Sequence, residues 1–426
     1  MASTLHSGLN IAIVGAGFAG LASATLLARA GHRVTVFEKF AQPQALGAGI
    51  LIQPSGLAAM QRLGIHDAVV QQGARIAHLY GVHPGQKPVV DVHYDDWRPG
   101  AFGLGLHRGV LFDALWHAAR AAGVQVQTGH EVRDLTALRA YHDLTVVADG
   151  ARSQTRGQTG LHVRDRLYPW GAVWAVLDDP TRRYGDTLWQ WYRGARQMLG
   201  IMPTGVTAAR PDAPPRQVVS LFWSLHADTW EAWQAAGLEA FKNEVRALNP
   251  HCEDLLGQLH SLEQLTWARY HDVVMPQYHT ADCVVIGDAA HATSPQLGQG
   301  TNLALLDAVA LADCLGAHNW TGTPATTTTA AQMAEALAHY TAQRRRHLHF
   351  YGQASRWLTP LFQSHWQALP WLRDRLMAQS LNWPLVGDLN LQTLVGVRQS
   401  WWPGAAGLDI ARVARGPMNT SDAAPQ

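Results

Sequence analysis

The chain has 426 residues, which corresponds to two or three domains. Hydrophobic residues make up 47% of it and charged residues 15%, a balance that excludes a globally disordered protein. The net charge of +1 leaves no overall field that would attract nucleic acid or an anionic membrane.

In chain order, the first elements form one βαβ unit. Residues 10–14 are a short apolar run that predicts a buried strand, and 18–30 have the spacing of a helix that ends at Gly31. Residues 33–38 are rich in β-branched side chains and predict a second strand. The stretch 9–28 is nearly apolar, but no Lys or Arg precedes it and glycines interrupt it, so we expect no signal peptide or membrane span.

The rest of the chain alternates between helical, extended and loop patterns. We expect helices at 55–63, 111–122, 229–248, 302–315 and over most of 333–400. We expect strands at 124–128, 144–148 and 283–287, and an antiparallel sheet over 168–227. The Pro- and Gly-rich stretch 81–102 indicates hairpin strands or a loop, 321–332 a linker, and the residues after 415 a frayed tail.

Three cysteines occur at wide spacing, without a C-x-x-C pair. This pattern supports neither a zinc cage nor a disulfide framework, and it favours a reducing, cytoplasmic location. The 22 histidines are read as core or surface residues, so we expect no metal.

The first motif is Gly15-Ala16-Gly17-Phe18-Ala19-Gly20, between the first predicted strand and helix. In this context Gly15 permits a tight turn, Gly17 lets the backbone approach a pyrophosphate, and Gly20 lets the helix pack on the strand. Glu38 ends the next strand, where a carboxylate can accept hydrogen bonds from a ribose diol. The motif predicts a dinucleotide site but does not separate NAD from FAD.

The second motif, GDAAHATSPQLGQG, covers residues 287–300. Asp288 follows an apolar strand, at the carboxyl edge where open α/β sheets bind ligands. We expect a buried carboxylate there to accept hydrogen bonds from a polyol such as a ribityl chain. Gly298 and Gly300 precede a predicted helix whose free amides would stabilise negative charge on a reduced flavin.

The third motif, from Asp149 to Arg156, reads D-G-x-x-S-x-x-R and follows the strand TVVA. Alone it indicates a turn and a helix cap. In their order and spacing over about residues 8–350, the three motifs resemble those of the single-component (class A) FAD-dependent aromatic hydroxylases, the family of p-hydroxybenzoate and salicylate hydroxylases. Three shorter matches support the resemblance. Residues 47–50 are similar to the family's segment beside the mobile isoalloxazine. Arg108 is similar to the family's arginine at the start of a helix that contacts FAD, and Val132 is similar to the residue whose backbone lies against the adenine.

The resemblance implies a fold and a set of FAD ligands. The fold is α/β, with a Rossmann-like, p-hydroxybenzoate hydroxylase-like FAD-binding domain, an antiparallel-sheet substrate domain and a C-terminal helical region. The expected bounds are 1–80, 103–167 and 266–330 for the discontinuous FAD-binding domain, 81–102 and 168–265 for the substrate domain, 331–415 for the helical region and 416–426 for a flexible tail. The implied FAD-binding residues are Gly15, Gly17, Phe18, Ala19, Gly20, Glu38, Lys39, Ala48, Gly49, Arg108, Val132, Asp149, Asp288, Pro295, Gly298, Gly300, Thr301 and Asn302.

The chemistry that the resemblance implies is hydroxylation of a phenolic or fused heteroaromatic molecule with NAD(P)H and O₂, through a flavin hydroperoxide. The protein positions the ring and excludes water. We expect the sheet to face the flavin, with Tyr192, His226 and Pro295 as catalytic residues, because a Tyr or His there would deprotonate a phenol. Candidate substrate contacts are Trp189, Trp191, Met202, Phe222 and Trp223; alternation lets only one of each adjacent pair face inward.

Several alternatives remain open. A flavin-dependent halogenase would carry a W-x-W-x-I-P motif, but here the pattern breaks after Trp191, and none of the three lysines lies in the expected segment. A dehydrogenase or reductase of the same fold, or a flavin-binding scaffold with a Trp-rich partner surface, is a further alternative. Arg193 or Arg196 would serve a carboxylate-bearing substrate. The choice between NADH and NADPH, and between a monomer and a homodimer, is not predicted.

Overall fold

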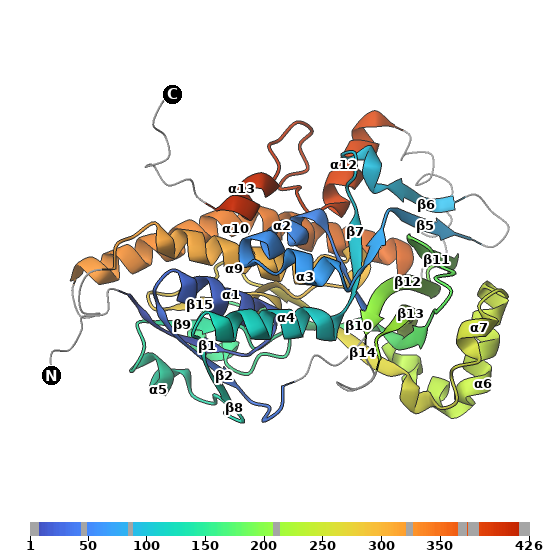
Figure 1. The fold of residues 1–426 in the computed structure, drawn as a ribbon, viewed down its shortest axis with the longest axis horizontal. Coiled ribbons are helices and arrows are strands. Elements are labelled where there is room, and N and C mark those ends of the chain that lie inside the picture. Colours follow the sequence, from blue (N-terminus) through green and yellow to red (C-terminus); the bar gives the residue numbers. More distant parts are fainter. Residues whose placement is uncertain are drawn as a thin grey trace.

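A computed structural model describes residues 8–43, 49–83, 88–207, 214–320, 327–364, 373 and 383–416 (Figure 1). A five-stranded parallel sheet has the order β15-β9-β1-β2-β8. Its strands are β1 (Asn10–Val14), β2 (Arg33–Glu38), β8 (Gln125–Thr128), β9 (Leu144–Val147) and β15 (Cys283–Val285). β1 pairs with β2 on one side and β9 on the other, so the glycine motif leaves the middle of the sheet.

Helices pack on this parallel sheet because their small and aliphatic residues continue its core. α1 (Phe18–Arg29) contacts α9 (Gly300–Gly316) and α4 (Arg108–Ala121). α2 (Pro54–Leu63) contacts α9 and α3 (His66–Val70), while α5 (Leu135–Arg139) lies against β9. α1 and α9 are buried over most of their length, which explains why neither has a polar face.

The largest sheet has seven strands in the order β14-β10-β13-β12-β11-β5-β6. The strands are β5 (His78–Val82), β6 (Pro88–His93), β10 (Arg164–Asp178), β11 (Thr187–Arg193), β12 (Gln197–Thr207), β13 (Arg216–His226) and β14 (Thr266–Val274). All neighbours are antiparallel except β11 and β5. α6 (Trp230–Leu248) and α7 (Glu253–Leu256), yellow-green in Figure 1, cover one face with their own apolar cluster.

A smaller sheet joins these two layers. Its order is β3-β7-β4, from β3 (Gly49–Ile52), β4 (Ala74–Ile76) and β7 (Gly103–His107). β7 contacts β12 of the large sheet, and the amide of Gly49 donates to Ser220 Oγ on β13 over 2.8 Å. The small sheet therefore fixes the two larger sheets against each other.

The C-terminal part is helical, as expected, with α10 (Thr327–Phe362), α12 (Pro384–Leu394) and α13 (Ile410–Arg415). α10 packs on α9, and α13 packs on α2. The remaining short helices are α8 (Asp288–His291) and the 3₁₀ turns η1 (Tyr94–Asp96), η2 (Arg156–Thr159), η3 (Ala227–Thr229), η4 (Leu262–Gln264) and η5 (Pro295–Leu297). No helix in the described part of the chain combines the length and apolar character that a membrane crossing requires.

The α/β fold with its antiparallel sheet and C-terminal helices is confirmed. Several boundaries differ. The large sheet also takes in β14 at 266–274, the start of β10 from 164 and β5 from 78, because their backbone pairs with that sheet. The predicted linker ends sooner, since α10 begins at Thr327, and α6 is broken at Gly237, whose φ is +84°. The domain division itself stays a prediction, and residues 417–426 of the expected tail lie outside the described residues.

Candidate functional site

The glycines of the first motif each meet a different steric demand. Gly15 has a φ of +101°, and a Cβ there would lie 2.6 Å from the carbonyl oxygen of Ala148. A Cβ at Gly20 would lie 2.0 Å from the carbonyl oxygen of Gly15, so only glycine lets α1 pack this closely on the turn. A Cβ at Gly17 would meet nothing within 4 Å. Gly17 caps α1 without a side-chain hydrogen bond, so the helix presents free amides to open space.

Glu38 lies under this turn rather than beside open space. Its Oε2 accepts the amide of Ala16 over 2.8 Å, and its Oε1 accepts the amide of Phe40 over 2.9 Å. The carboxylate therefore helps to shape the glycine turn, and each oxygen keeps a lone pair for a further donor. Lys39 is exposed, with its ammonium 4.9 Å from the Phe40 ring centroid.

One cavity of about 700 Å³ connects the glycine turn to the large sheet, a size in the upper range of small-molecule sites. At one end it is lined by Gly17, Phe18 and Ala19 of the first motif and by Arg108, whose guanidinium lies 5.3 Å from the Phe18 ring centroid. The cavity also includes Ala148, Gly150 and Ala151 of the third motif and most of the second motif from Ala292 to Thr301. The sequence-distant motifs therefore share one space.

The second motif enters the cavity at two points. Asp288, at the start of α8, lines the cavity and is exposed, so the expectation of a buried carboxylate is wrong. Pro295, Gly298, Gly300 and Thr301 line the cavity where α9 begins, and Gln299 caps that helix without a side-chain hydrogen bond. Free amides at the start of α9 therefore face the same space as Asp288.

Asn302 does not line the cavity. Its side chain is fully buried, where Oδ1 accepts the amide of Gln53 over 2.9 Å and Nδ2 donates to the carbonyl of Gly298 over 2.9 Å. It holds the start of α9 against the segment that leaves β3. Its side chain therefore has a positioning role, and its implied contact with FAD stays a prediction.

The third motif connects the other two. Asp149 Oδ2 accepts the amide of Gln154 over 3.1 Å and the hydroxyl of Thr155 over 3.0 Å. Its other oxygen, Oδ1, is buried and has no hydrogen-bond partner among the described residues, directly beside the lining residues Ala148 and Gly150. Arg156 is buried and donates to the carbonyl of Ala289 over 2.8 Å, so it ties this motif to the second one.

The remaining implied FAD ligands are spread around this space. Gly49 lines the cavity, but Glu38 and Lys39 do not. Val132 is half-buried and packs on the apolar core of the parallel sheet and its helices. Ala48 lies outside the described residues. Their contacts with FAD stay predictions.

The large sheet faces the cavity with alternate residues of each strand. Leu188, Gln190 and Tyr192 of β11 line the cavity, while Trp189 and Trp191 point to the other face and pack on the α6–α7 cluster. Met202 and Phe222 line the cavity as predicted, but Trp223 is 1% exposed in the opposite cluster. The prediction that Trp189, Trp191 and Trp223 line the substrate space is therefore wrong, because these three side chains lie on the opposite face of the sheet.

His226 also lies elsewhere, at the end of β13. Its ring packs edge-on against Trp170 with centroids 5.0 Å apart, and its Nδ1 accepts the amide of Asp228 over 3.3 Å. It is not a lining residue, so its expected role as a base in the cavity is not supported.

Sequence reasoning missed His271, the histidine among the residues that line the cavity. Its Nδ1 lies 2.9 Å from Asp165 Oδ1, and the same carboxylate forms an ion pair with Arg156. The pair joins residues 106 positions apart through the pairing of β10 and β14, a long-range contact without a local sequence signal.

Two tyrosines of the cavity are held in the neutral form. Burial raises the pKa of the Tyr192 phenol, against a smaller opposing effect of Arg373, and its hydroxyl donates to Gln190 Oε1 over 2.9 Å. Burial also raises the pKa of Tyr270 to about 12, and its oxygen accepts Trp174 Nε1 over 3.3 Å. Tyr192 therefore donates a hydrogen bond within the cavity, and its expected catalytic role stays a prediction.

Few charged side chains line the cavity. The charged lining residues are Arg108, Arg269 and Asp288, whereas the residues from β5, β6, β11, β12 and β13 are uncharged. Arg193 donates to the carbonyl of Ala247 over 2.7 Å, and neither it nor Arg196 lines the cavity. These two arginines therefore do not meet a substrate carboxylate in this cavity.

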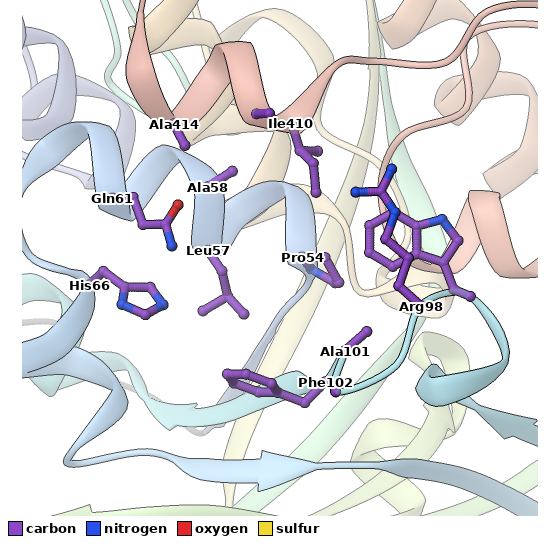
Figure 2. A pocket seen from close by; sticks show the side chains of 13 residues that line it. Pro54, Leu57, Ala58, Gln61, His66, Arg98, Ala101, Phe102, Ile410 and Ala414 are labelled. Carbon is purple, nitrogen blue, oxygen red and sulfur yellow. The ribbon is translucent and has the colours of Figure 1, made fainter.

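A second cavity of about 280 Å³ lies between α2, α13 and the turn at 97–102 (Figure 2). Leu57, Phe102 and Ile410 point into it, and no residue of the three motifs lines it. Because the three glycine-bearing motifs meet in the large cavity, that cavity is the better candidate for a dinucleotide.

The comparisons with known proteins agree with this site. A family model described as "FAD binding domain" matches residues 9–347. A 6-hydroxynicotinate 3-monooxygenase of Pseudomonas fluorescens is 27% identical over 335 residues, covering 72% of this chain and 84% of that protein. An aurachin C monooxygenase/isomerase of Stigmatella aurantiaca is 27% identical over 402 residues, covering 88% and 94%.

The fold is also found among solved structures. Klebsiella pneumoniae HpxO complexed with FAD and uric acid has a TM-score of 0.70 with this chain at 20% identity. The match covers 92% of this chain and 99% of that one. The two folds are therefore alike over most of the chain.

Proposed function

The chain belongs to the single-component FAD-dependent aromatic hydroxylases and is an FAD-dependent monooxygenase, and on that premise we propose that its substrate is a neutral, apolar aromatic molecule. The observation that carries the proposal is the single cavity that runs from the free amides of α1 to the uncharged residues of β5, β6, β11, β12 and β13 in the large sheet. Cofactor and substrate would meet there without crossing solvent.

The residues present fit FAD. A Cβ at Gly17 would meet open space, Asp149 Oδ1 is buried without a partner, and two helices begin with uncapped amides at the cavity. We propose that the amides of α1 and the guanidinium of Arg108 bind the pyrophosphate, and that Asp288 accepts hydrogen bonds from the ribityl chain. When bound, FAD takes a hydride from NAD(P)H and activates O₂.

The start of α9 suits the isoalloxazine end. Gly298 has a φ of +59°, and Gly298, Gly300 and Thr301 line the cavity between Asp288 and the sheet. The positive end of the α9 dipole would stabilise negative charge on the reduced ring. Pro295 borders the same space and stays a predicted contact.

The substrate end is apolar. The lining residues from the hairpin and the neighbouring strands are Leu79, Val90, Val92, Leu188, Met198, Met202 and Phe222, and Phe362 of α10 faces them. A carboxylate placed here would lose its hydration among side chains that carry no charge, which disfavours an acidic ring substrate. The same walls would keep water from the reaction.

Gln190 is suited to orient the ring. Because Tyr192 donates to Gln190 Oε1, the Nε2 amide of Gln190 is free to donate to a carbonyl or phenolic oxygen of a substrate. Tyr192 would fix the amide in this orientation, since its own pKa is raised and it keeps its proton.

We propose that His271 takes the proton from the substrate hydroxyl. Asp165 lies 2.9 Å from Nδ1, an arrangement that fixes the ring and leaves Nε2 for the proton transfer. A deprotonated phenol is more electron-rich and accepts an electrophilic oxygen more readily. The His271→Gln variant should lower kcat by about a hundredfold and change its pH dependence. FAD content should be unchanged, and an unaltered pH profile would contradict the assignment.

The proposal is tested with purified protein and a matched pair of aromatic panels, one neutral and one carboxylated. We expect the yellow holoprotein to consume NADH or NADPH faster with neutral phenols or fused heteroaromatics, and to incorporate one atom of ¹⁸O₂ into the product. Stimulation only by carboxylated compounds would contradict the substrate class. Substrate-dependent NAD(P)H consumption without oxygen incorporation would favour the dehydrogenase alternative.

The Gln190→Leu variant is a control for the substrate end. It keeps the size and loses the hydrogen-bonding group, so KM should rise about tenfold while FAD affinity stays the same. A cytoplasmic location stays a prediction, and the choice between a monomer and a homodimer stays open; the three cysteines, all buried and outside any disulfide, support a reducing location.

A further inference from the structure

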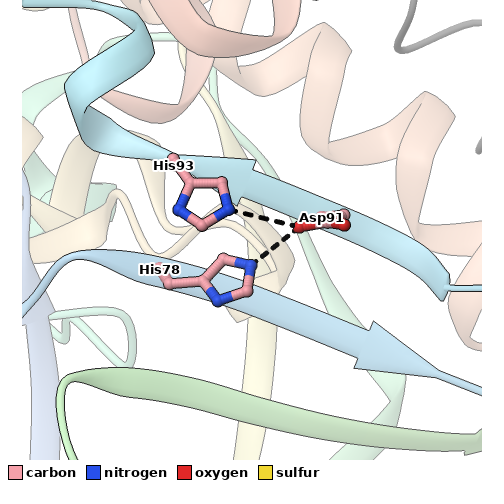
Figure 3. A group of neighbouring side chains, drawn as sticks. All are labelled: His78, Asp91 and His93. Atoms are coloured by element: carbon pink, nitrogen blue, oxygen red, sulfur yellow. Dashed lines mark hydrogen bonds and ion pairs between the residues drawn. The ribbon is translucent and has the colours of Figure 1, made fainter.

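A cluster of two histidines and an aspartate lies on the β5–β6 hairpin, at the edge of the large sheet (Figure 3). His78 of β5 is the cross-strand partner of His93 of β6, and Asp91 precedes His93 by two residues on the same face. The register of the hairpin therefore brings three possible metal ligands together on one side.

The ligand atoms are close to the spacing of a metal site. Asp91 Oδ1 lies 2.7 Å from Nε2 of His78 and 3.6 Å from Nε2 of His93, and all ligand atoms lie within 4.8 Å of one another. Zn²⁺ binds nitrogen and oxygen at about 2.0–2.2 Å, which in a tetrahedral site separates ligands by roughly 3.4 Å. Small shifts of the side chains would satisfy these distances.

Binding of a metal ion requires one rearrangement, because the two imidazole rings are not oriented toward a common point. The two imidazoles are stacked, with centroids 3.9 Å apart and planes at 9°, so their lone pairs run side by side instead of converging. The side chain of His93 is 53% exposed and that of His78 is 20% exposed. His93 therefore has the freedom to turn its ring toward a shared cation while His78 stays in place.

We propose that His78, Asp91 and His93 form a binding site for Zn²⁺, with the remaining coordination position open to water. Two neutral imidazoles and one carboxylate are the ligand types that zinc prefers, and the site is reached from solvent. No local sequence pattern predicts this site, because His78 and Asp91 are 13 positions apart and meet only in the hairpin.

The position of the site gives it a consequence for the cavity. On the opposite face of the same two strands, Leu79, Val90 and Val92 line the substrate end. A Cβ at Gly81 would lie 2.7 Å from the Tyr192 ring, so β5 packs tightly on the residue that orients Gln190. A cation that bridges β5 and β6 would hold this wall, and this consequence rests on the proposed function.

The test measures zinc on the chelator-treated holoprotein by equilibrium dialysis at micromolar Zn²⁺. We expect one Zn²⁺ per chain, at least a tenfold loss of affinity in His78→Ala and His93→Ala, and recovery in His93→Cys, which supplies a thiolate ligand. Zn²⁺ should raise the Tm of the wild-type protein and leave that of His93→Ala unchanged.

The matched control is His66→Ala. His66 also pairs with an aspartate, Asp67, over 2.8 Å, but no third ligand was found beside it in the described part of the chain. This variant should bind Zn²⁺ like the wild type. Failure of the wild type to bind one Zn²⁺ at micromolar concentration, or full binding by the His78→Ala/His93→Ala double variant, would overturn the proposal. FAD content and circular dichroism establish that each variant is folded, and neither outcome depends on hydroxylase activity.

Discussion

Nε2 of His291 lies 2.6 Å from the carboxylate of Asp307, on the buried side of the second motif. The same carboxylate accepts the amide of Gly287 over 2.8 Å and Arg344 Nε over 2.7 Å. Burial opposes its ionisation, but the charges and hydrogen bonds of His291 and Arg344, with the Gly287 amide, hold the pKa of Asp307 well below its usual range. This anion therefore fixes the turn that presents Asp288 to the cavity.

Replacing Asp307 should destabilise both the fold and the cofactor site. Asp307→Asn leaves Arg344 buried without its anion, so we expect a loss of about 3–5 kcal/mol in the free energy of unfolding and weaker FAD retention. Urea unfolding and FAD titration measure the two effects. The double variant Asp307→Leu/Arg344→Met removes both charges and should recover part of the stability; equal losses in both variants would argue against the charge pairing as the cause.

Gly17 and Gly20 should respond differently to the same added methyl group. Gly20→Ala places a Cβ 2.0 Å from a backbone oxygen, which should cost about 1–3 kcal/mol of stability and also lower FAD affinity. Gly17→Ala meets no protein atom, so it should leave apoprotein stability unchanged and lower FAD affinity at least tenfold, because the methyl group enters the pyrophosphate space. Normal FAD affinity in Gly17→Ala would exclude the proposed approach of the pyrophosphate.

Neighbouring residues on β13 should separate substrate binding from packing. Phe222→Ala and Trp223→Ala each remove a buried aromatic ring, and each should cost about 3–5 kcal/mol in urea unfolding. Only Phe222 lines the cavity, so only its variant should change KM, by tenfold or more. A comparable change of KM in Trp223→Ala would show that the two faces of the sheet are not independent.

Stability should fall on mild acidification because His32 is buried. Burial lowers the pKa of His32 to about 4, and its Nδ1 accepts the amide of Leu9 over 3.1 Å. Between its unfolded pKa near 6.5 and about pH 4, the unfolded chain binds a proton that the folded chain does not, so stability is lost as the pH falls through this window. The full effect is about 3 kcal/mol.

The measurement is urea unfolding of the wild type and of His32→Asn between pH 4 and pH 8. Asparagine keeps an acceptor for the Leu9 amide and does not titrate, so the variant should lose less stability across this range. Burial also lowers the pKa of His347, to about 3, so part of the dependence should remain in the variant. Identical curves for both proteins would exclude His32 as a source of the pH dependence.

The cofactor end of the cavity was predictable from sequence because its geometry is local. The carbonyl of Gly15 excludes a Cβ at Gly20 within one βαβ unit, whereas the carbonyl that excludes a Cβ at Gly15 belongs to Ala148, directly after the neighbouring strand β9. The order of helices and strands around each motif was likewise predictable from the periodicity of apolar residues within short stretches of sequence. Asn302 was the exception, because its partners Gln53 and Leu51 come from a distant segment.

The substrate end was predicted only in part because it depends on register. Because side chains alternate along a strand, the sequence predicted that Tyr192, Met202 and Phe222 lie on one of the two faces of the sheet. It did not determine which of the two faces lines the cavity. Irregularities in the pairing, such as the shift on β10 between Leu167 and Gly171, change which residues face inward. His226 was misplaced because it ends β13, and His271 was missed because β14 was not assigned to this sheet.

The β5–β6 hairpin is continuous in sequence and falls between β4 and β7, two strands of the small sheet. Its apolar face forms part of the substrate wall, yet it contributes no residue to the three glycine-bearing motifs. A change in ring preference can therefore arise by exchanging one uninterrupted piece of chain, roughly residues 77–94, without disturbing the strands that carry the dinucleotide. This segment is therefore a suitable unit for grafting in enzyme engineering.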